Sequence, residues 1–137
     1  MEAVCGLIGI RIYRRPLPES LSAAVMSIGV DAFVIAVNNS HGPGRRRFSV
    51  AHELGHAVLR HAAGYYLEYA VEDHWEPPNY SYFDEREANA FAAALLMDER
   101  WVREDFAAGM RDVKELADRY AVSSAAMGFR LTNLGLN

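Results

Sequence analysis

The first forty residues contain short runs of Ile, Val, Phe and Tyr, the residue types that favour β-strands. The clearest runs are residues 7–13 and 32–37, and a weaker one covers residues 23–28. Residues 27–31 then form a hairpin turn. The pattern predicts a small antiparallel or mixed sheet of about three strands within residues 1–40.

After residue 42 the apolar residues take the spacing of a helix. Over residues 43–62 the predicted apolar stripe is Phe48, Ala51, Leu54, Val58 and Leu59. Residues 82–97 are rich in alanine, and their predicted buried stripe is Ala88, Phe91, Ala92, Leu95 and Leu96. We therefore expect two long helices after the sheet.

The C-terminal part of the chain has the pattern of a helix pair over residues 111–134. Its predicted buried residues are Val113, Leu116, Ala117, Tyr120, Met127, Leu131 and Leu134, and Ser123 or Ser124 can cap the second helix. The elements together predict an α+β fold, in which the sheet packs on a helical core and two further helices follow. A length of 137 residues suits one domain spanning residues 1–137.

Composition and charge narrow the class of protein. A net charge of -4 opposes direct nucleic-acid binding. The apolar stretch 21–37 contains Asp31 and is short for a membrane span. The basic residues follow the apolar residues 1–10, whereas an export signal has them first. The single cysteine, Cys5, cannot form an internal disulfide. We therefore expect a cytoplasmic protein with no membrane partner.

The stretch His52-Glu53-Leu54-Gly55-His56 lies within the first predicted helix. Residues four apart share one helix face, so both imidazoles can bind one tetrahedral zinc ion. Glu53 lies about 100° around the helix, within reach of a water at the metal, where it can act as a general base. The alternative is a pair of hydrogen-bonded histidines on a packed helix.

A catalytic zinc site with two histidines needs a third protein ligand, commonly a carboxylate from another element. The second predicted helix supplies Glu85. Asn89 follows one turn later, where its side chain can hydrogen-bond a ligating histidine. Glu87 instead shares its side with the bulky Phe91. We therefore predict Glu85 as the third ligand and Asn89 as an outer partner of the site.

These motifs resemble the ImmA/IrrE metallopeptidases, small bacterial and phage proteins whose known members cut helix-turn-helix repressors. The resemblance rests on residues 47–56 and 85–97, and it extends to Gly9-Ile10, the strand at 35–38 and the ending at 130–136. It implies a zincin core laid out like that of the thermolysin-type peptidases. It implies as metal ligands His52, His56 and Glu85, with Glu53 as the general base.

The chain departs from the family pattern at two places. Met97-Asp98 stands where the family usually has Met-Pro, so the end of the second helix is expected to differ. Many members carry a third histidine at the end of the first helix. In this chain the histidine is displaced by one position, to His61 after Arg60, and we assign it no role. Neither departure touches the predicted ligands.

The segment between Gly64 and Tyr82 is aromatic and long for a connection. Its best candidates for contacting the oxyanion or the substrate are His74 and Tyr80. The alternative is that these side chains only cover the edge of the core. An edge strand beside the zinc helix could also align an extended peptide through main-chain hydrogen bonds.

Arg45, Arg46 and Arg47 open the first helix, where the helix dipole disfavours positive charge. A solvated turn is the default interpretation, and a patch for an acidic partner or a packing role are the alternatives. Residues 116–127 have the pattern of a helix-turn-helix, but the second helix offers only Arg130, Thr132 and two Asn side chains to DNA. We prefer packing or repressor docking for this region.

The expected function is zinc-dependent endopeptidase activity. Zn²⁺, with Mn²⁺ as the other candidate, would activate a water, and Glu53 would move its proton to the leaving nitrogen. The resemblance implies as substrate a helix-turn-helix repressor of the XRE type, in a phage, mobile-element or stress-response switch. The alternative is a regulator that binds a repressor or DNA through its C-terminal helices without cutting.

Overall fold

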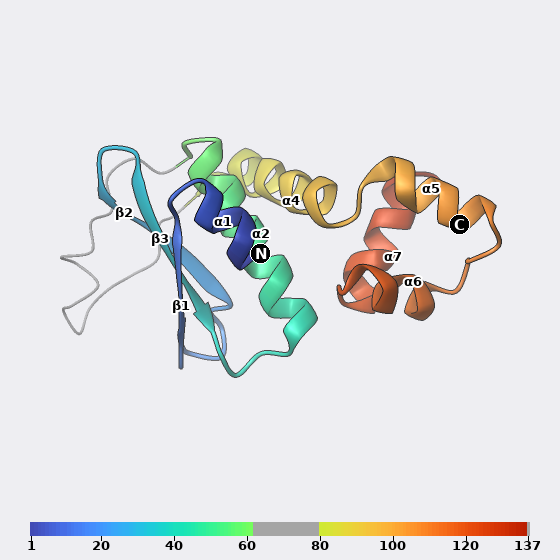
Figure 1. Cartoon of the computed structure of the whole chain (residues 1–137), viewed down its shortest axis with the longest axis horizontal. Helices are drawn as coiled ribbons and strands as arrows, with labels where there is room; N and C mark the ends of the chain where they lie inside the picture. The colour runs from blue at the N-terminus through green and yellow to red at the C-terminus, as the bar shows by residue number, and fades with distance from the viewer. Residues whose placement is uncertain (62–79, 137) are drawn as a thin grey trace.

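The computed structural model describes residues 1–61 and 80–136 (Figure 1). Its fold is α+β, as the sequence predicts. The helices are α1 (Glu2–Leu7), α2 (Pro43–Val58), α4 (Tyr82–Leu96), α5 (Glu99–Ala107), α6 (Val113–Tyr120) and α7 (Ser124–Asn133), and the strands are β1 (Arg11–Arg15), β2 (Ala23–Gly29) and β3 (Ala32–Asn38). The sheet lies at one end of the molecule and α5, α6 and α7 at the other, with α2 and α4 between them.

The sheet is mixed, with β3 in the centre and the strand order β1-β3-β2. β1 runs parallel to β3, and β2 runs antiparallel to it. The hairpin between β2 and β3 is tighter than predicted, because its turn consists of Val30 and Asp31 alone. Asp31 has a φ of 55°, which a short polar side chain tolerates better than most. Because β3 lies in the centre, β2 is an edge strand of this sheet.

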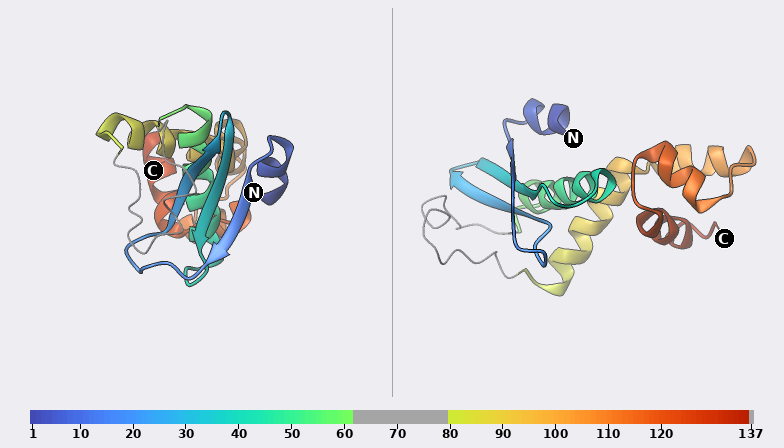
Figure 2. Two further views of the ribbon diagram at one scale, coloured as in Figure 1. Left: turned by 90° about the vertical axis from the view of Figure 1, so that its left-hand side faces the viewer. Right: turned by 90° about the horizontal axis from the view of Figure 1, so that it is seen from below.

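α2 lies between the sheet and the C-terminal helices (Figure 2) and contributes to two hydrophobic cores. Val50 and Leu54 belong to the core under the sheet. Ala51 belongs to a second core together with Ala92 of α4 and Leu116 of α6. Burial of apolar surface on both sides fixes the rotation of α2 about its axis. It therefore also fixes the direction of the side chains that lie between the Val50 and Leu54 side and the Ala51 side.

Gly55 allows α4 to approach α2 closely. A Cβ atom on this residue would lie 3.1 Å from the Cα of Ala88 and 3.2 Å from the side chain of Phe91. Few side chains fit such a gap, so the glycine sets the separation of the two helices. The residues of α4 that precede Ala88 are thereby brought over the His52 face of α2.

The three C-terminal helices begin at side-chain caps. Asp98, Asp112 and Ser123 accept hydrogen bonds from backbone N–H groups in the first turns of α5, α6 and α7. The cap by Ser123 is one of the two predicted options. Asp98 follows α4 at the position where the chain departs from the family pattern, and it starts α5, a helix that the apolar pattern does not predict.

The sequence prediction is wrong at the N-terminus. Residues 7–10 do not belong to a strand, because α1 covers Glu2–Leu7 and β1 begins at Arg11. A short apolar run without alternation fits either element, and here the helix buries Cys5. The first motif helix also ends earlier than predicted, at Val58.

Four apolar residues of the predicted helix stripes are exposed. Val58, Leu59, Leu95 and Val113 keep 49%, 40%, 40% and 36% of their surface accessible. Val58 and Leu59 lie at the end of α2, and Leu95 points away from the α2 side of its helix, which Ala92 and Leu96 occupy. Among residues 1–61 and 80–136, no helix is both long and apolar enough to cross a bilayer.

The arginines at the start of α2 contact neighbouring elements. Arg45 donates to the Ser22 hydroxyl over 3.1 Å and Arg46 to the His41 carbonyl over 2.8 Å. Arg47 donates to the carbonyl of Tyr120, at the C-terminal end of α6. Since Arg46 and Arg47 are half-buried, the solvated-turn interpretation is wrong for these two, and Arg47 has the packing role.

Candidate metal centre

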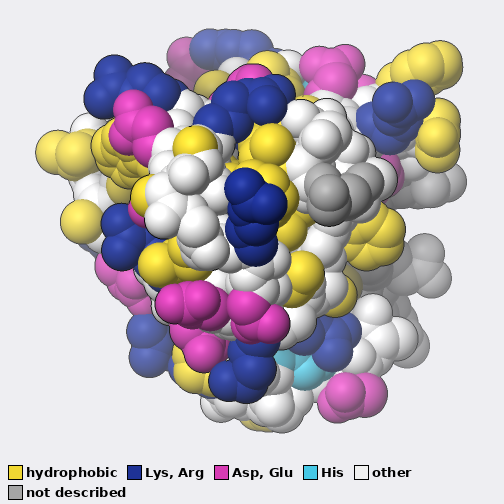
Figure 3. Space-filling view, turned by 90° about the vertical axis from the view of Figure 1, so that its right-hand side faces the viewer, with side chains coloured by type: hydrophobic (Ala, Val, Ile, Leu, Met, Phe, Trp, Pro, Cys, Tyr) yellow, Lys and Arg dark blue, Asp and Glu magenta, His cyan; other side chains and the backbone are white. Residues whose placement is uncertain are grey.

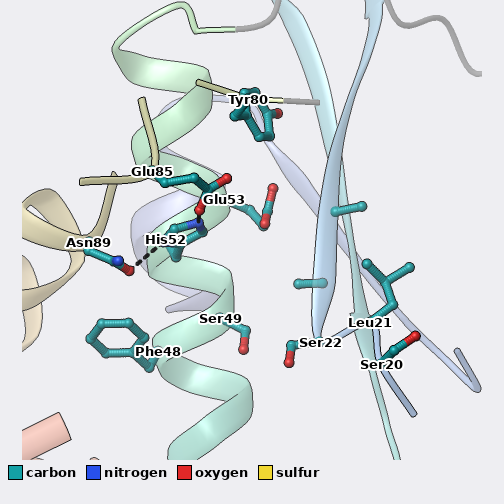
Figure 4. A pocket seen from close by; sticks show the side chains of 12 residues that line it. Ser20, Leu21, Ser22, Phe48, Ser49, His52, Glu53, Tyr80, Glu85 and Asn89 are labelled. Atoms are coloured by element: carbon teal, nitrogen blue, oxygen red, sulfur yellow. Dashed lines mark hydrogen bonds and ion pairs between the residues drawn. The ribbon is translucent and has the colours of Figure 1, made fainter. Parts of the chain in front are cut away.

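The structure brings the three predicted ligands together, and Figure 4 shows two of them, His52 and Glu85, side by side. His52 and His56 lie one turn apart on α2, and their Nε2 atoms are 3.0 Å from each other. Glu85 reaches them from α4, with one carboxylate oxygen 3.1 Å from His52 Nε2 and the other 3.4 Å from His56 Nε2. His56 is buried, whereas Glu85 remains partly open to solvent.

Asn89 occupies the outer position predicted for it. Its side-chain oxygen lies 2.9 Å from His52 Nδ1. Because this oxygen only accepts, Nδ1 of the neutral His52 carries the proton, and its Nε2 lone pair faces Glu85.

His61, to which the sequence assigns no role, is the corresponding partner of His56. The two Nδ1 atoms are 2.9 Å apart. Nε2 of His61 lies 3.8 Å from a carboxylate oxygen of Asp84 and 3.7 Å from one of Glu87. These carboxylates favour a proton on His61 Nε2, so His61 Nδ1 accepts and His56 Nδ1 donates. Glu87 therefore contacts His61.

The sequence carries little signal for this arrangement. Arg60 adopts a φ of 58°, and the backbone N–H of His61 donates to the His56 carbonyl over 3.0 Å, which folds His61 back beneath α2. Glycine or asparagine commonly marks such a reversal at a helix end, and Arg does not. A histidine five residues after a ligand was the available hint.

The donor set fits a single divalent cation. The hydrogen bonds to Asn89 and His61 turn the Nε2 lone pairs of His52 and His56 toward each other and toward the Glu85 carboxylate. The two ring nitrogens and the two carboxylate oxygens are electron-rich, and at this range they repel one another unless a cation lies among them. Tetrahedral zinc, with bonds of roughly 2.0–2.1 Å to N and O, holds its ligands about 3.3–3.4 Å apart. The observed separations of 3.0, 3.1 and 3.4 Å are close to that spacing.

Glu53 lies beside the ligands and is anchored to the sheet. One of its carboxylate oxygens accepts a hydrogen bond of 3.0 Å from the backbone N–H of Val25 in β2. Burial raises the pKa of Glu53 to about 8, the Val25 bond opposes that rise, and the charge of Glu85 adds to it. Glu53 also belongs, with His52 and His56, to a compact group of potential ligand atoms.

Burial also lowers the pKa of His56, to about 4, and the neighbouring His52 and His61 lower it further while Asp84 opposes them. The imidazole of His56 is therefore neutral near pH 7. Neutral imidazole is the form that binds metal ions.

A cavity of about 450 Å³ opens beside this cluster, between α2 and the edge strand β2. Ser22 and Ala23 line it from the sheet side, and Ser49 and His52 from α2. Tyr80, one of the two predicted substrate contacts, lines the cavity and stacks on the His56 ring with a centroid distance of 3.6 Å. The other candidate, His74, lies outside the described residues.

Comparison with known proteins bears on this arrangement. Residues 5–132 match the family described as the IrrE N-terminal-like domain, whose model carries the name of a peptidase family. The radiation response metalloprotease IrrE of Deinococcus radiodurans is 34% identical over 102 residues. That alignment covers 72% of this chain and 30% of the relative, so the chain spans less than a third of the relative's length.

Proposed function

Because the chain belongs to the IrrE N-terminal-like domain family, we propose that it is a zinc-dependent endopeptidase with a protein substrate. One observation carries this proposal. Two imidazole nitrogens and the Glu85 carboxylate converge within 3.4 Å of one another, and Glu53 stands beside them at an open cavity.

In this proposal the metal is held by His52, His56 and Glu85. When bound, zinc supplies Lewis acidity, which polarises a peptide carbonyl and lowers the pKa of a water to about 7. Mn²⁺ can accept the same nitrogen and carboxylate donors. Asn89 and His61 keep the imidazole lone pairs directed at the ion.

Glu53 moves the proton in the proposed reaction. A cation held beside Glu53 would favour its charged form and so oppose the rise in its pKa that burial causes. The carboxylate accepts a proton from the attacking water as the new C–O bond forms, and then donates that proton to the amide nitrogen as the C–N bond breaks. The products are a carboxylate and an amine, and no side chain of the protein forms a covalent bond to the substrate. The bond from Val25 fixes one Glu53 oxygen, which leaves the other available for the water.

The edge strand β2 supplies a place for the substrate backbone. Ser22, Ala23 and Ala24 line the cavity next to His52 and Glu53. An extended peptide added along this edge would lie between β2 and the ligands, and would present a carbonyl to the metal centre. Tyr80, at the same cavity, is the remaining candidate for contact with the substrate or the oxyanion.

We propose a helix-turn-helix repressor as the substrate, in a phage, mobile-element or stress-response switch in the cytoplasm. The family resemblance of the sequence and the name of the relative, a radiation response metalloprotease, support this choice. The face formed by the C-terminal helices carries acidic and basic side chains interspersed (Figure 3), which gives little support to direct nucleic-acid binding.

The second candidate is a regulator that acts by binding alone. The observation in its favour is the pair α6 and α7, whose short connection and packed faces are those of a helix-turn-helix. It would bind a repressor or DNA without using Glu53.

Glu53→Gln separates the two candidates. Zinc content is measured by atomic absorption, and cleavage of a purified helix-turn-helix repressor is followed by mass spectrometry. For a peptidase, the variant keeps about one zinc per chain but cuts roughly 100- to 10,000-fold more slowly, since it has lost its general base. Regulation that persists undiminished in the zinc-loaded variant would instead identify the binding regulator.

A further inference from the structure

A second groove, of about 830 Å³, runs between α4 and α7. Phe48 and Asn89 line both this groove and the cavity beside His52, so the two adjoin each other. The residues that form the rest of its walls come from α4 and its C-cap (Tyr82, Arg86, Ala90, Ala93 and Met97) and from α7 (Ala125, Ala126, Phe129, Arg130 and Asn133). We refer to it as the α4–α7 groove.

Small side chains create the hollow and large ones stand at its edges. Four alanines line it, at Ala90, Ala93, Ala125 and Ala126. Tyr82 and Phe129, which also line it, keep 71% and 73% of their surface exposed. Exposed aromatic side chains around an apolar depression are typical of surfaces that bind other polypeptides.

The groove is also positive. None of its twelve described lining residues is Asp or Glu, in a chain that has 18 acidic residues and 14 basic ones. Arg130 donates from Nε to the Met97 carbonyl over 2.9 Å, and the guanidinium of Arg86 lies 5.7 Å from the centre of the Tyr82 ring. Within the described part of the chain neither arginine forms an ion pair. The groove therefore favours negatively charged groups, which in a polypeptide are the carboxylates of Asp and Glu.

We propose that the α4–α7 groove binds the segment of the protein substrate next to its scissile bond, and that this segment combines a large apolar side chain with Asp or Glu. This inference rests on the proposed peptidase function, because the groove adjoins the cavity at the metal centre and so places the segment beside the cut. α4 is 15 residues long, which gives about 22 Å of helix and room for roughly seven residues of extended peptide.

The test selects binders from a randomised, displayed peptide library with zinc-loaded Glu53→Gln protein, which is expected to bind peptides without cutting them. Selected peptides are synthesised and their affinity is measured by fluorescence anisotropy. We expect them to pair an aromatic or large aliphatic residue with an acidic one. Adding Ala90→Trp, which fills the groove, should weaken binding by about tenfold or more.

Ala94→Trp is the matched control for added bulk, because Ala94 is exposed on the same helix but lines no part of the groove. It should change the affinity by less than about twofold. Arg86→Glu should weaken acidic peptides by about three- to tenfold and strengthen peptides with Lys in place of the acid, whereas Arg100→Glu on α5 should do neither.

Equal weakening by Ala90→Trp and Ala94→Trp would overturn the proposal, as would a selection that enriches no peptide or enriches peptides without the apolar and acidic pair. A dimer that sediments as a monomer only after Ala90→Trp would also overturn it, because a second copy would then fill the groove. If zinc-loaded wild type leaves the groove-bound peptides intact, the peptidase proposal is refuted and the groove proposal stands. If the peptides are cut and Ala90→Trp leaves their KM unchanged, the groove proposal is refuted and the peptidase proposal stands.

Discussion

At the scale of single residues, the arrangement of hydrogen bonds explains why two histidines can act as a metal site. Each imidazole has two nitrogens, and only the one without a proton can bind a metal. Asn89 accepts from one ring and His61 from the other, so both unprotonated nitrogens face Glu85. The outer partners therefore select the tautomers of the inner ligands.

His61→Ala should weaken zinc binding without removing a ligand. The variant leaves His56 Nδ1 without its acceptor, and the loss of such an outer partner typically costs about 10- to 100-fold in metal affinity. Competition against a chromophoric chelator measures the change. His61→Asn, whose side-chain oxygen can still accept, should recover part of the affinity. An unchanged zinc Kd in His61→Ala would show that His56 does not depend on this contact.

At the scale of helices and strands, the close contact at Gly55 decides where Glu85 lies. Gly55→Ala gains helix propensity of about 1 kcal/mol, but the new methyl group meets Ala88 and Phe91 at 3.1–3.2 Å. Overpacking of this kind costs about 1–3 kcal/mol. We expect net destabilisation in urea unfolding, with weaker zinc binding because α4 moves away.

Gly128→Ala in α7 is the matched control for Gly55→Ala. A Cβ atom on Gly128 would meet no heavy atom within 4 Å beyond its chain neighbours and the backbone of its own helix. This change should stabilise the protein by about 0.4–1 kcal/mol, since only the propensity gain remains. If Gly55→Ala lowers the free energy of unfolding and Gly128→Ala raises it, the close contact between α2 and α4 is the cause of the difference. If Gly55→Ala raises it, the contact does not have the proposed effect.

Asp105 links α5 to α6 through side-chain contacts. It accepts hydrogen bonds of 2.6 Å from the Tyr120 hydroxyl and 2.7 Å from Arg119 Nε. The Tyr120 bond is the main cause that lowers the Asp105 pKa, and Arg119 lowers it further against the effect of burial. A depressed pKa gives stability above the ordinary carboxyl value of about 3.9, and this stability is lost as the pH falls through the lowered pKa.

Asp105→Asn should therefore destabilise the protein at pH 7 and progressively less below about pH 4, where wild type loses the same contribution. Urea unfolding at several pH values measures the difference. Asp118→Asn, in an exposed pair with Lys114, should have a small effect throughout. A wild-type advantage that stayed constant down to pH 2 would rule out the Asp105 carboxylate as its source.

At the scale of the whole molecule, α2 takes part in both hydrophobic cores and carries the histidines, so metal binding should stabilise the entire fold. Zinc at a hundredfold excess over its Kd adds about 2.7 kcal/mol to the free energy of unfolding. Chelation should lower the Tm by the corresponding several degrees. Glu85→Ala should abolish the zinc-dependent rise in Tm, whereas Glu87→Ala should keep most of it. The reverse outcome would assign the third ligand to Glu87.

Much of this molecule could be predicted from its sequence, because helix and strand periods are local. The spacing of His52 and His56 places both on one face of any helix, and the alanine-rich segment could be recognised as the partner of that helix. The position of His61 could not, since it depends on a left-handed Arg60. Nor could α1 be predicted, since the choice between helix and strand for its short apolar run is made by packing around Cys5.

The bond between Val25 and Glu53 has a further consequence for how the protein tolerates change. A slip of one residue between β2 and β3 would turn the Val25 N–H inward and release the carboxylate. The register irregularity of this pair lies between Ser27 and Gly29, beyond Val25 and toward the hairpin. Longer hairpins can therefore be inserted between Gly29 and Ala32 while the Glu53 carboxylate stays in place.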